Sequence, residues 1–369
     1  MDIGVRMKRL TIYMMLIGAI ALGSLTACGS VQNADTHGEE TDTSIQTTFV
    51  PDEAGEDVLC ATQDIFAMDT YMTLTAYGEQ AKEAVLAAVE EIDRLDNLLS
   101  TEDRDSEVYR LNQKGSVTVS EDTAALIEKS GELYEDTGGA FDITIYPLMV
   151  EWGFPSKNFK VPSQSRIDRL LQCVDASKIR YDKEKKTVTL PDQVQIDLGG
   201  ITKGYTSGRV MDIYRKYDIH SGLVSLGGNV QLLGKKVDGS SWRVAVEDPK
   251  DTSQYIGVLE ETDKAIITSG GYERYFEEDG RVWHHILDPA TGYPADSGLT
   301  SVTIVSGDGA LADGLSTALF IMGKEKALDF WRKNPDRFDT ILVEEDGSIT
   351  VTAGIADKFT SDNTFTVAE

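Results

Sequence analysis

The chain has 369 residues, of which 41% are hydrophobic, and its formal net charge is −27 at pH 7. This length and apolar content suffice for one large or two ordinary globular domains with a real core. Such an acidic surface repels the phosphates of nucleic acids and has no basic stripe to follow their backbone, which excludes nucleic-acid binding as the function. An anionic ligand must therefore be held by a local group of cations.

The first 27 residues have the organisation of a secretory signal. Three basic residues precede the apolar stretch 10–25, which is too short and too promptly followed by polar sequence to favour a membrane-spanning helix. Residues 25–29, Leu-Thr-Ala-Cys-Gly, are similar to a bacterial lipobox. We therefore predict a lipoprotein signal peptide at 1–27 and lipid attached to Cys28, which would hold an extracytoplasmic protein at the cell membrane. The alternative is a cleaved signal whose cysteine is incidental.

The following segment is polar and precedes a single folded domain. Residues 29–57 are mostly Ser, Thr, Asp, Glu, Gly and Gln, so we predict that 28–57 is a lipidated cysteine followed by a disordered tether. The domain would then occupy 58–369. Its two cysteines, Cys60 and Cys173, could form one disulfide or remain two buried thiols, and the sequence leaves both open.

The domain is predicted to be α+β, with antiparallel sheets and helices packed on them. Alternating apolar residues predict one long strand over 63–77, and helical spacing predicts amphipathic helices over 80–99 and from Ser120 to about 136. The other predicted elements are a short helix at 165–173, hairpins at 179–190 and 338–352, strands at 194–198, 223–226, 265–269 and 299–306, and helices from about 201 to 217 and from 309.

Paired glycines follow three of the predicted strands, at 199–200, 227–228 and 270–271. Glycine permits positive φ and a close approach of a ligand to backbone N–H groups, so three pairs indicate the walls of a binding cleft, whereas one pair is usually a turn. Lys203 follows the first pair at a helix start, where aligned N–H donors and a mobile cation suit a phosphate. The spacing matches neither a P-loop nor a dinucleotide fingerprint.

Asp313 and Thr317 are four residues apart in the last predicted helix and so share one face. A carboxylate and a hydroxyl, completed by water and phosphate oxygens, suit a hard cation such as Mg²⁺. The alternative is that Asp313 caps the helix and Thr317 is packed.

His284 and His285 are two of only four histidines and end a predicted hairpin at 272–286. A two-residue turn at 279–280 would place Arg274 opposite His285, so that a cation and an imidazole share one face near a loop. The alternative is that both histidines are ordinary strand residues.

Together these segments resemble the ApbE-type flavin transferases, the FAD:protein FMN transferases, from about residue 65 to 358. The motifs occur in family order and are Met68-Asp69-Thr70, Ala140-Phe141-Asp142, Trp152-Gly153-Phe154, 197–204, 226–229, 268–274, 285–292 and 312–317. The resemblance implies an ApbE-type, T-fold-like architecture and a Mg²⁺-dependent reaction. In it, FMN from FAD is attached through a phosphoester to a Thr or Ser of an acceptor protein, and AMP is released. The implied acceptor is a membrane redox subunit.

The resemblance also implies roles for individual residues. Mg²⁺ would be held by Asp313, Thr317 and the carbonyl of Thr202. His285 would be the base for the acceptor hydroxyl. The residues themselves, rather than the resemblance, suggest that Arg274 would help Lys203 and Mg²⁺ to offset the pyrophosphate charge. The residues that would contact FAD are Met68, Ala140, Phe141, Asp142, Asp197, Lys203, His285 and Ile286.

Three positions depart from the family pattern: Asp69 stands where Gly is usual, Thr202 where Ala is common, and Gly271 where Asp or Asn is usual. Two other functions stay open. Water could replace the acceptor hydroxyl, which would make the protein an FAD pyrophosphatase. It could also be a non-catalytic FAD-binding lipoprotein, although loss of His285 or Asp313 would then be expected and both are present.

Overall fold

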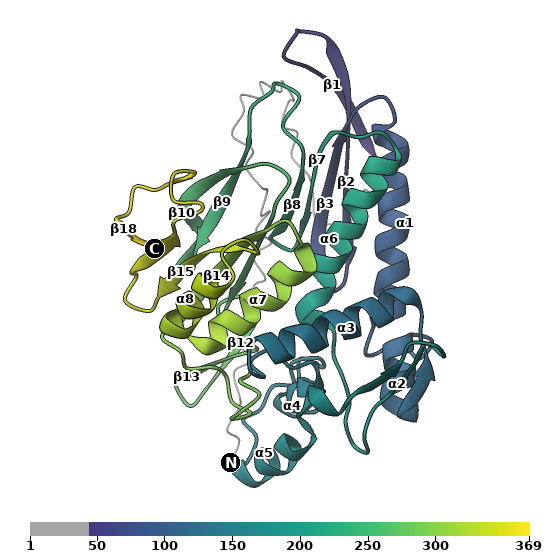
Figure 1. Ribbon diagram of the computed structural model, residues 1–369, viewed down its shortest axis with the longest axis vertical. Coiled ribbons are helices and arrows are strands. Elements are labelled where there is room, and N and C mark those ends of the chain that lie inside the picture. The colour runs from purple at the N-terminus through teal and green to yellow at the C-terminus, as the bar shows by residue number, and fades with distance from the viewer. Residues whose placement is uncertain (1–43) are drawn as a thin grey trace, which may run out of the picture.

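The structure is a computed structural model that describes residues 44–369. The predicted signal peptide, Cys28 and most of the predicted tether lie outside these residues. A ten-stranded sheet runs through the molecule (Figure 1), and its neighbouring strands are antiparallel except for the last pair. In spatial order its strands are β1 (Gln46–Pro51), β2 (Asp57–Ala67), β3 (Thr70–Tyr77), β7 (Ser221–Leu226), β8 (Asn229–Leu233), β11 (Ala265–Gly270), β14 (Leu299–Ser306), β15 (Asp339–Glu344), β16 (Ile349–Thr352) and β18 (Phe365–Ala368).

Three smaller sheets and the helices complete the described chain. The small sheets are β9 (Trp242–Asp248), β10 (Asp251–Glu261) and β17 (Phe359–Thr360); β4 (Ser116–Thr118), β5 (Arg180–Asp182) and β6 (Thr187–Thr189); and the hairpin β12 (Tyr275–Glu278) and β13 (Arg281–His284). The helices are α1 (Ala81–Leu99), α2 (Glu107–Lys114), α3 (Glu121–Asp136), α4 (Tyr146–Trp152), α5 (Gln164–Leu170), α6 (Gly199–Lys216), α7 (Gly309–Met322) and α8 (Lys324–Lys333), with short 3₁₀ turns at Ile143–Ile145, Leu171–Cys173 and Ala176–Lys178.

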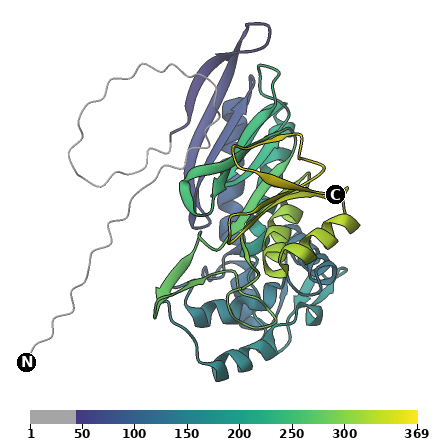
Figure 2. The ribbon, with the colours of Figure 1, turned by 90° about the vertical axis from the view of Figure 1, so that its left-hand side faces the viewer.

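Alternation along the strands of the main sheet gives it two apolar faces, and both are covered. On one face, residues such as Leu74 of β3 pack with Ile92 of α1 and Tyr214 of α6. On the other face, Ile266 of β11 packs with Trp242 of β9. Helices α3 to α5 lie at one end of the main sheet (Figure 1). In Figure 2 the β12–β13 hairpin projects to the side, near where these helices meet the sheet. The predicted α+β class is confirmed.

The prediction that the tether runs to residue 57 is wrong for its last part. Residues 46–51 form β1, which pairs along its whole length with β2. Nearly all of its side chains are exposed. An edge strand with solvent on both sides needs no apolar alternation, so its polar composition concealed it.

The single long strand predicted over 63–77 is also wrong, because two antiparallel strands occupy this segment. β2 and β3 pair up to Ala67 and Thr70, which leaves Met68 and Asp69 as a two-residue turn. Both turn residues have positive φ, 50° and 59°. Two consecutive positive values are typical of a type I′ hairpin turn, which usually carries Asn-Gly or Asp-Gly. The absence of such a pair explains the error.

The strand predicted at 194–198 does not form. The amide of Asn112 takes the place of a neighbouring strand: its Nδ2 donates to Ile196 O at 2.8 Å, and its Oδ1 accepts from Ile196 N at 2.7 Å. The next residue, Asp197, donates its N–H to Ile143 O. A side chain distant in the sequence therefore makes the backbone hydrogen bonds that a neighbouring strand would otherwise make. Helix α6 begins immediately afterwards at Gly199.

Several local predictions are confirmed. The Ser120 side chain accepts from Thr123 N and so caps α3. The predicted turn at 279–280 forms, and the register pairs Tyr275 with His284. Cys60 and Cys173 are free thiols, which answers the question left open by the sequence.

Helices α6 and α7 cross at two glycines. A Cβ on Gly204 would collide with Gly309 O and lie 2.7 Å from the Cβ of Asp313, and a Cβ on Gly309 would collide with Gly204 O. The close approach lets Gly204 N donate to the Asp313 carboxylate at 2.8 Å. Gly208, one turn further along α6, has no atom within 4 Å of an added Cβ.

We expect Gly204→Ala to lower the free energy of unfolding by about 1–3 kcal/mol, because the added methyl forces two packed backbones apart. The matched Gly208→Ala should instead raise it by about 0.4–1 kcal/mol, since alanine is the better helix former and the site has room. Chemical denaturation of both variants checks this. Equal effects of the two substitutions would contradict the close crossing.

Candidate functional site

The first two turns of α6 are where the predicted site residues meet. Asp197 accepts from Gly199 N through its Oδ1 at 2.8 Å. A Cβ on Gly200 would lie only 3.2 Å from the Phe141 ring, so glycine here lets that ring pack on the helix. Thr206 Oγ1 lies 3.9 Å from the sulfur of Met68. Segments far apart in the sequence thus converge on one helix start.

Asp313 is a buried carboxylate in α7. It accepts from Gly204 N at 2.8 Å and from Asn229 Nδ2 at 3.3 Å. Within residues 44–369 no cation lies at ion-pair distance from it; burial raises its pKa, and the charge of Lys203 opposes that rise. The helix is capped by Asp308, which accepts from Leu311 N, so the alternative that Asp313 is the cap is wrong.

The side chains around Asp313 fit a hard cation. Thr317 lies one turn along the same helix face, and a carboxylate with a hydroxyl is the donor set that Mg²⁺ prefers. The Thr202 hydroxyl donates its proton to Leu198 O at 2.8 Å, so it hydrogen-bonds to its own helix, and the predicted role needs only the Thr202 carbonyl. In the described part of the chain no three His, Cys, Asp or Glu residues cluster as metal ligands, and the predicted site needs only one carboxylate.

His285 is held against the backbone of Arg274, as the hairpin register predicted. His285 N donates to Arg274 O at 3.0 Å, and its ring Nδ1 lies 3.2 Å from the same oxygen. Because a carbonyl oxygen only accepts, this contact places the ring proton on Nδ1 and leaves the Nε2 lone pair free. Burial, then the charge of Arg274, lowers the pKa of His285 to about 3. The ring is therefore neutral at physiological pH.

Two cations lie near these groups without an ion pair. Within the described residues, neither Lys203 nor Arg274 makes a salt bridge. The Lys203 charge nevertheless reaches Asp197, His285 and Asp313, because it contributes to the pKa shift of each. Both cations remain available to an anionic ligand.

The other predicted contacts are placed less directly. The Asp142 carboxylate accepts from Thr144 N and Oγ1 and from Ala176 N, so it holds two loops together. Ile286 is buried in the main core. Ala140 lies in the same loop as Phe141, with its N–H donated to Thr137 O. Their contact with FAD stays a prediction.

Of the three glycine pairs, only 227–228 has positive φ, at 60° and 91°. The others serve close packing: a Cβ on Gly270 would collide with the Tyr272 ring, and one on Gly271 would lie 3.0 Å from His284. Only the pair at 227–228 therefore uses the positive φ that glycine permits.

Sequence reasoning missed three residues of this site. Asn229 donates to Asp313, and Ser269 contacts Thr317 through their hydroxyl groups. The pKa of Glu273 is raised, chiefly because the surrounding protein displaces water from its carboxylate; Lys203 opposes this rise, and Asp313 adds to it. Each of the three lies within a motif that carried the family resemblance, and that position was the only signal available.

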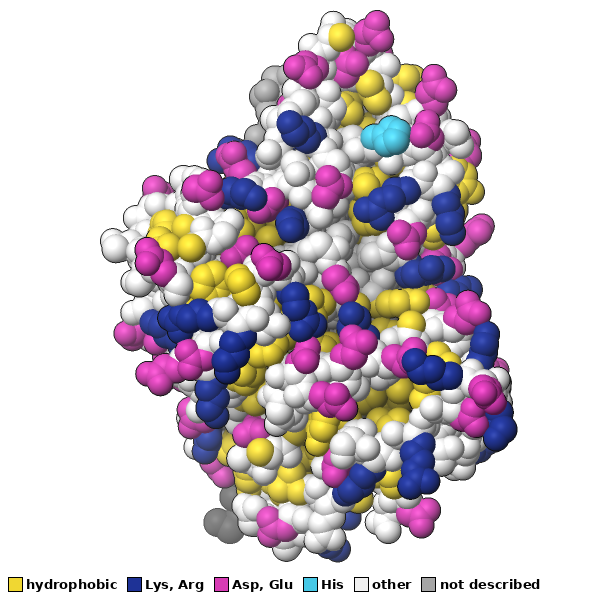
Figure 3. All heavy atoms as spheres, viewed as in Figure 1, with side chains coloured by type: hydrophobic (Ala, Val, Ile, Leu, Met, Phe, Trp, Pro, Cys, Tyr) yellow, Lys and Arg dark blue, Asp and Glu magenta, His cyan; other side chains and the backbone are white. Residues whose placement is uncertain are grey.

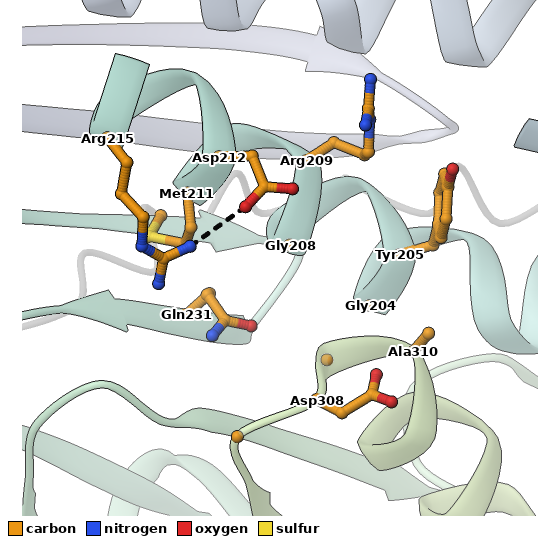
Figure 4. A pocket seen from close by; sticks show the side chains of 12 residues that line it. Gly204, Tyr205, Gly208, Arg209, Met211, Asp212, Arg215, Gln231, Asp308 and Ala310 are labelled. Carbon is orange, nitrogen blue, oxygen red and sulfur yellow. Dashed lines mark hydrogen bonds and ion pairs between the residues drawn. The ribbon is translucent and has the colours of Figure 1, made fainter. Parts of the chain in front are cut away.

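A separate cavity of about 300 Å³ lies beside the α6–α7 crossing, between the residues labelled in Figure 4. Its charged residues pair locally, as Arg215 does with Asp212 at 3.1 Å. None of the predicted site residues lines it. The cavity therefore adjoins the candidate site at Gly204 but is lined by none of its predicted residues.

The surface fits an acidic protein with local cations. On the face in Figure 3, acidic and basic side chains are interspersed. Among residues 44–369, no helix combines the length and apolar character needed to cross a membrane.

Comparison with known proteins gives one family. A model of the ApbE family matches residues 68–342. The FAD:protein FMN transferase of Haemophilus influenzae is 32% identical over 78% of this chain and 86% of its own, and that of Klebsiella pneumoniae is 35% identical over 71% and 82%. An ApbE protein from Thermotoga maritima has a TM-score of 0.74 at 33% identity, covering 82% of this chain and 96% of its own. The flavin transferase ApbE from Vibrio cholerae has a TM-score of 0.73 at 26% identity, covering 80% and 98%. The chain therefore belongs to the ApbE family.

Proposed function

We propose that this protein is a Mg²⁺-dependent FAD:protein FMN transferase, which attaches FMN to a Thr or Ser of an acceptor protein and releases AMP. The relatives that carry this name support the activity. The observation that carries the proposal is the convergence at the start of α6. Two unpaired cations, Lys203 and Arg274, lie there with the buried carboxylate of Asp313 and the neutral imidazole of His285.

The residues for Mg²⁺ are Asp313, Thr317 and the carbonyl of Thr202. An uncompensated buried carboxylate is unfavourable, and a bound divalent cation would offset that penalty. When bound, the ion supplies charge neutralisation to the pyrophosphate oxygens. Gly204 N and Asn229 hold the carboxylate in place through hydrogen bonds.

Lys203 and Arg274 bind and orient the pyrophosphate of FAD. The acceptor oxygen forms a bond to the FMN phosphorus, and the bond from that phosphorus to the bridging oxygen breaks. The AMP phosphate leaves with this electron pair. Charge moves onto the leaving group in this step, and fixed cations stabilise it most at that point.

His285 takes the proton of the acceptor hydroxyl on Nε2. Its Nδ1–H is held by Arg274 O, so the ring already has the required tautomer. A bound pyrophosphate offsets the nearby positive charges that lower the pKa of His285, so the imidazole becomes a stronger base when FAD is present.

We also propose that the protein acts outside the cytoplasm as a lipoprotein anchored through Cys28, which brings it to a membrane acceptor. The support is the sequence of residues 1–29 alone. The tether between Cys28 and β1 would allow the domain to reach a partner at the same surface.

We expect Asp313→Asn to lower Mg²⁺-dependent transfer by about 100-fold or more, because the metal contribution amounts to several kcal/mol. The matched control is Asp308→Asn in the same helix, since asparagine also caps helices well and activity should be kept. AMP release against Mg²⁺ concentration measures both. Full activity of Asp313→Asn would overturn the metal assignment.

We expect His285→Ala to bind FAD but to transfer FMN about 10²–10⁴-fold more slowly, as is typical for loss of a general base. Because the pKa of His285 in the free enzyme is low, His285 loses its base function only as pH falls towards about 3. The ratio of wild-type to variant kcat/KM should therefore stay constant from pH 6 to 8. His220→Ala, at an exposed histidine paired with Asp218, is the control.

Unchanged transfer in His285→Ala would show that another group is the base. A wild-type acidic limb near pH 6.5 that vanishes in the variant would contradict the lowered pKa of His285.

A further inference from the structure

A chain of three hydroxyl groups joins β11 to the metal-binding face of α7. Ser269 Oγ lies 2.7 Å from Ser316 Oγ and 3.3 Å from Thr317 Oγ1. Ser316 Oγ in turn donates to the backbone oxygen of Asp313 at 2.7 Å. Ser316 is fully buried, so no solvent competes for its hydroxyl.

The direction of these hydrogen bonds follows from donor counting. Each hydroxyl has one proton, and the carbonyl of Asp313 can only accept, so the proton of Ser316 is used there. Ser269 must then donate to Ser316, which leaves Ser269 only acceptor capacity towards Thr317. The remaining arrangement has Thr317 donating to Ser269.

We infer that Ser269 is a positioning residue for the divalent cation, because its hydroxyl accepts the hydrogen bond of Thr317 and so leaves the Thr317 lone pairs for a cation shared with Asp313. The inference rests on the metal site of the proposed function. A cation binds a hydroxyl oxygen through its lone pairs and is repelled by the hydroxyl proton, so the preset direction favours binding. Replacing a residue that hydrogen-bonds a metal ligand, without touching the metal itself, typically lowers metal affinity by about 10–100-fold.

The neighbouring strand residue offers a matched control. Thr268 also makes a hydroxyl pair, with Thr303 Oγ1 at 2.8 Å, but successive side chains of a strand point to opposite faces. Thr268→Val thus removes a comparable hydroxyl bond from the same strand without touching α7.

The test is a titration of the full chain with Mn²⁺, monitored through the electron paramagnetic resonance signal of free Mn²⁺. This measurement of binding needs no turnover. We expect Ser269→Ala to weaken Mn²⁺ binding about tenfold or more, Ser269→Thr to restore it, and Thr268→Val to leave it unchanged. Ser316→Ala should also weaken binding. The double variant Ser269→Ala with Ser316→Ala should bind Mn²⁺ no more weakly than the weaker-binding of the two single variants, because both substitutions break the same chain of hydroxyl groups.

Binding by Ser269→Ala within twofold of wild type would overturn the inference, provided that wild type binds Mn²⁺ and Asp313→Asn does not. In that case the proposed metal site stands, but the chain of hydroxyl groups does not contribute to it. If wild type binds no Mn²⁺ with or without FAD, the metal site of the proposed function fails and the inference fails with it. Equal weakening by Thr268→Val would show that the loss reflects strand stability, which also overturns the inference.

Discussion

The site depends on the close crossing of α6 and α7 at Gly204 and Gly309. Only glycines let these two backbones approach so closely, and the approach brings the Asp313 carboxylate to the N–H of Gly204. The same helix start receives Phe141 and Met68 from other parts of the chain. The crossing thus places Asp313 beside a helix that also contacts Phe141 and Met68, and rigid elements hold functional groups better than loops do.

The site has local positive charge, whereas the whole protein has a large net negative charge. A net charge of −27 disfavours an anionic substrate, yet Lys203 and Arg274 lie near His285 without ion-pair partners in the described chain. Burial and the charges of Arg274 and Lys203 lower the pKa of His285 and keep its ring neutral. Burial raises the pKa of Asp313, and the charge of Lys203 opposes that rise. In the proposed reaction, substrate binding and proton transfer would be coupled through the same cations, because a bound pyrophosphate would change the field that sets the base strength of His285.

The sequence predicted features governed by local chemistry and missed those set by distant contacts. The Ser120 cap, the register that joins Arg274 to His285, and the shared face of Asp313 and Thr317 follow from neighbouring residues. The segment at 194–198 could not be predicted, since a side chain more than eighty residues away replaces its strand partner. The turn at 68–69 lacks the usual residues, and β1 lacks an apolar face. Ser269 acquires its role only when β11 packs on α7.

The central claim is group transfer to a protein, and the intact mass of the acceptor tests it most directly. The full chain would be incubated with FAD, Mg²⁺ and a candidate redox subunit, and the mixture would be denatured and weighed. We expect an acceptor heavier by one FMN, with the added mass lost when Mg²⁺ is chelated or Asp313 is replaced by asparagine. FAD cleaved to FMN and AMP while every tested acceptor keeps its mass would contradict transfer and indicate hydrolysis. FAD that stays intact throughout would contradict catalysis itself.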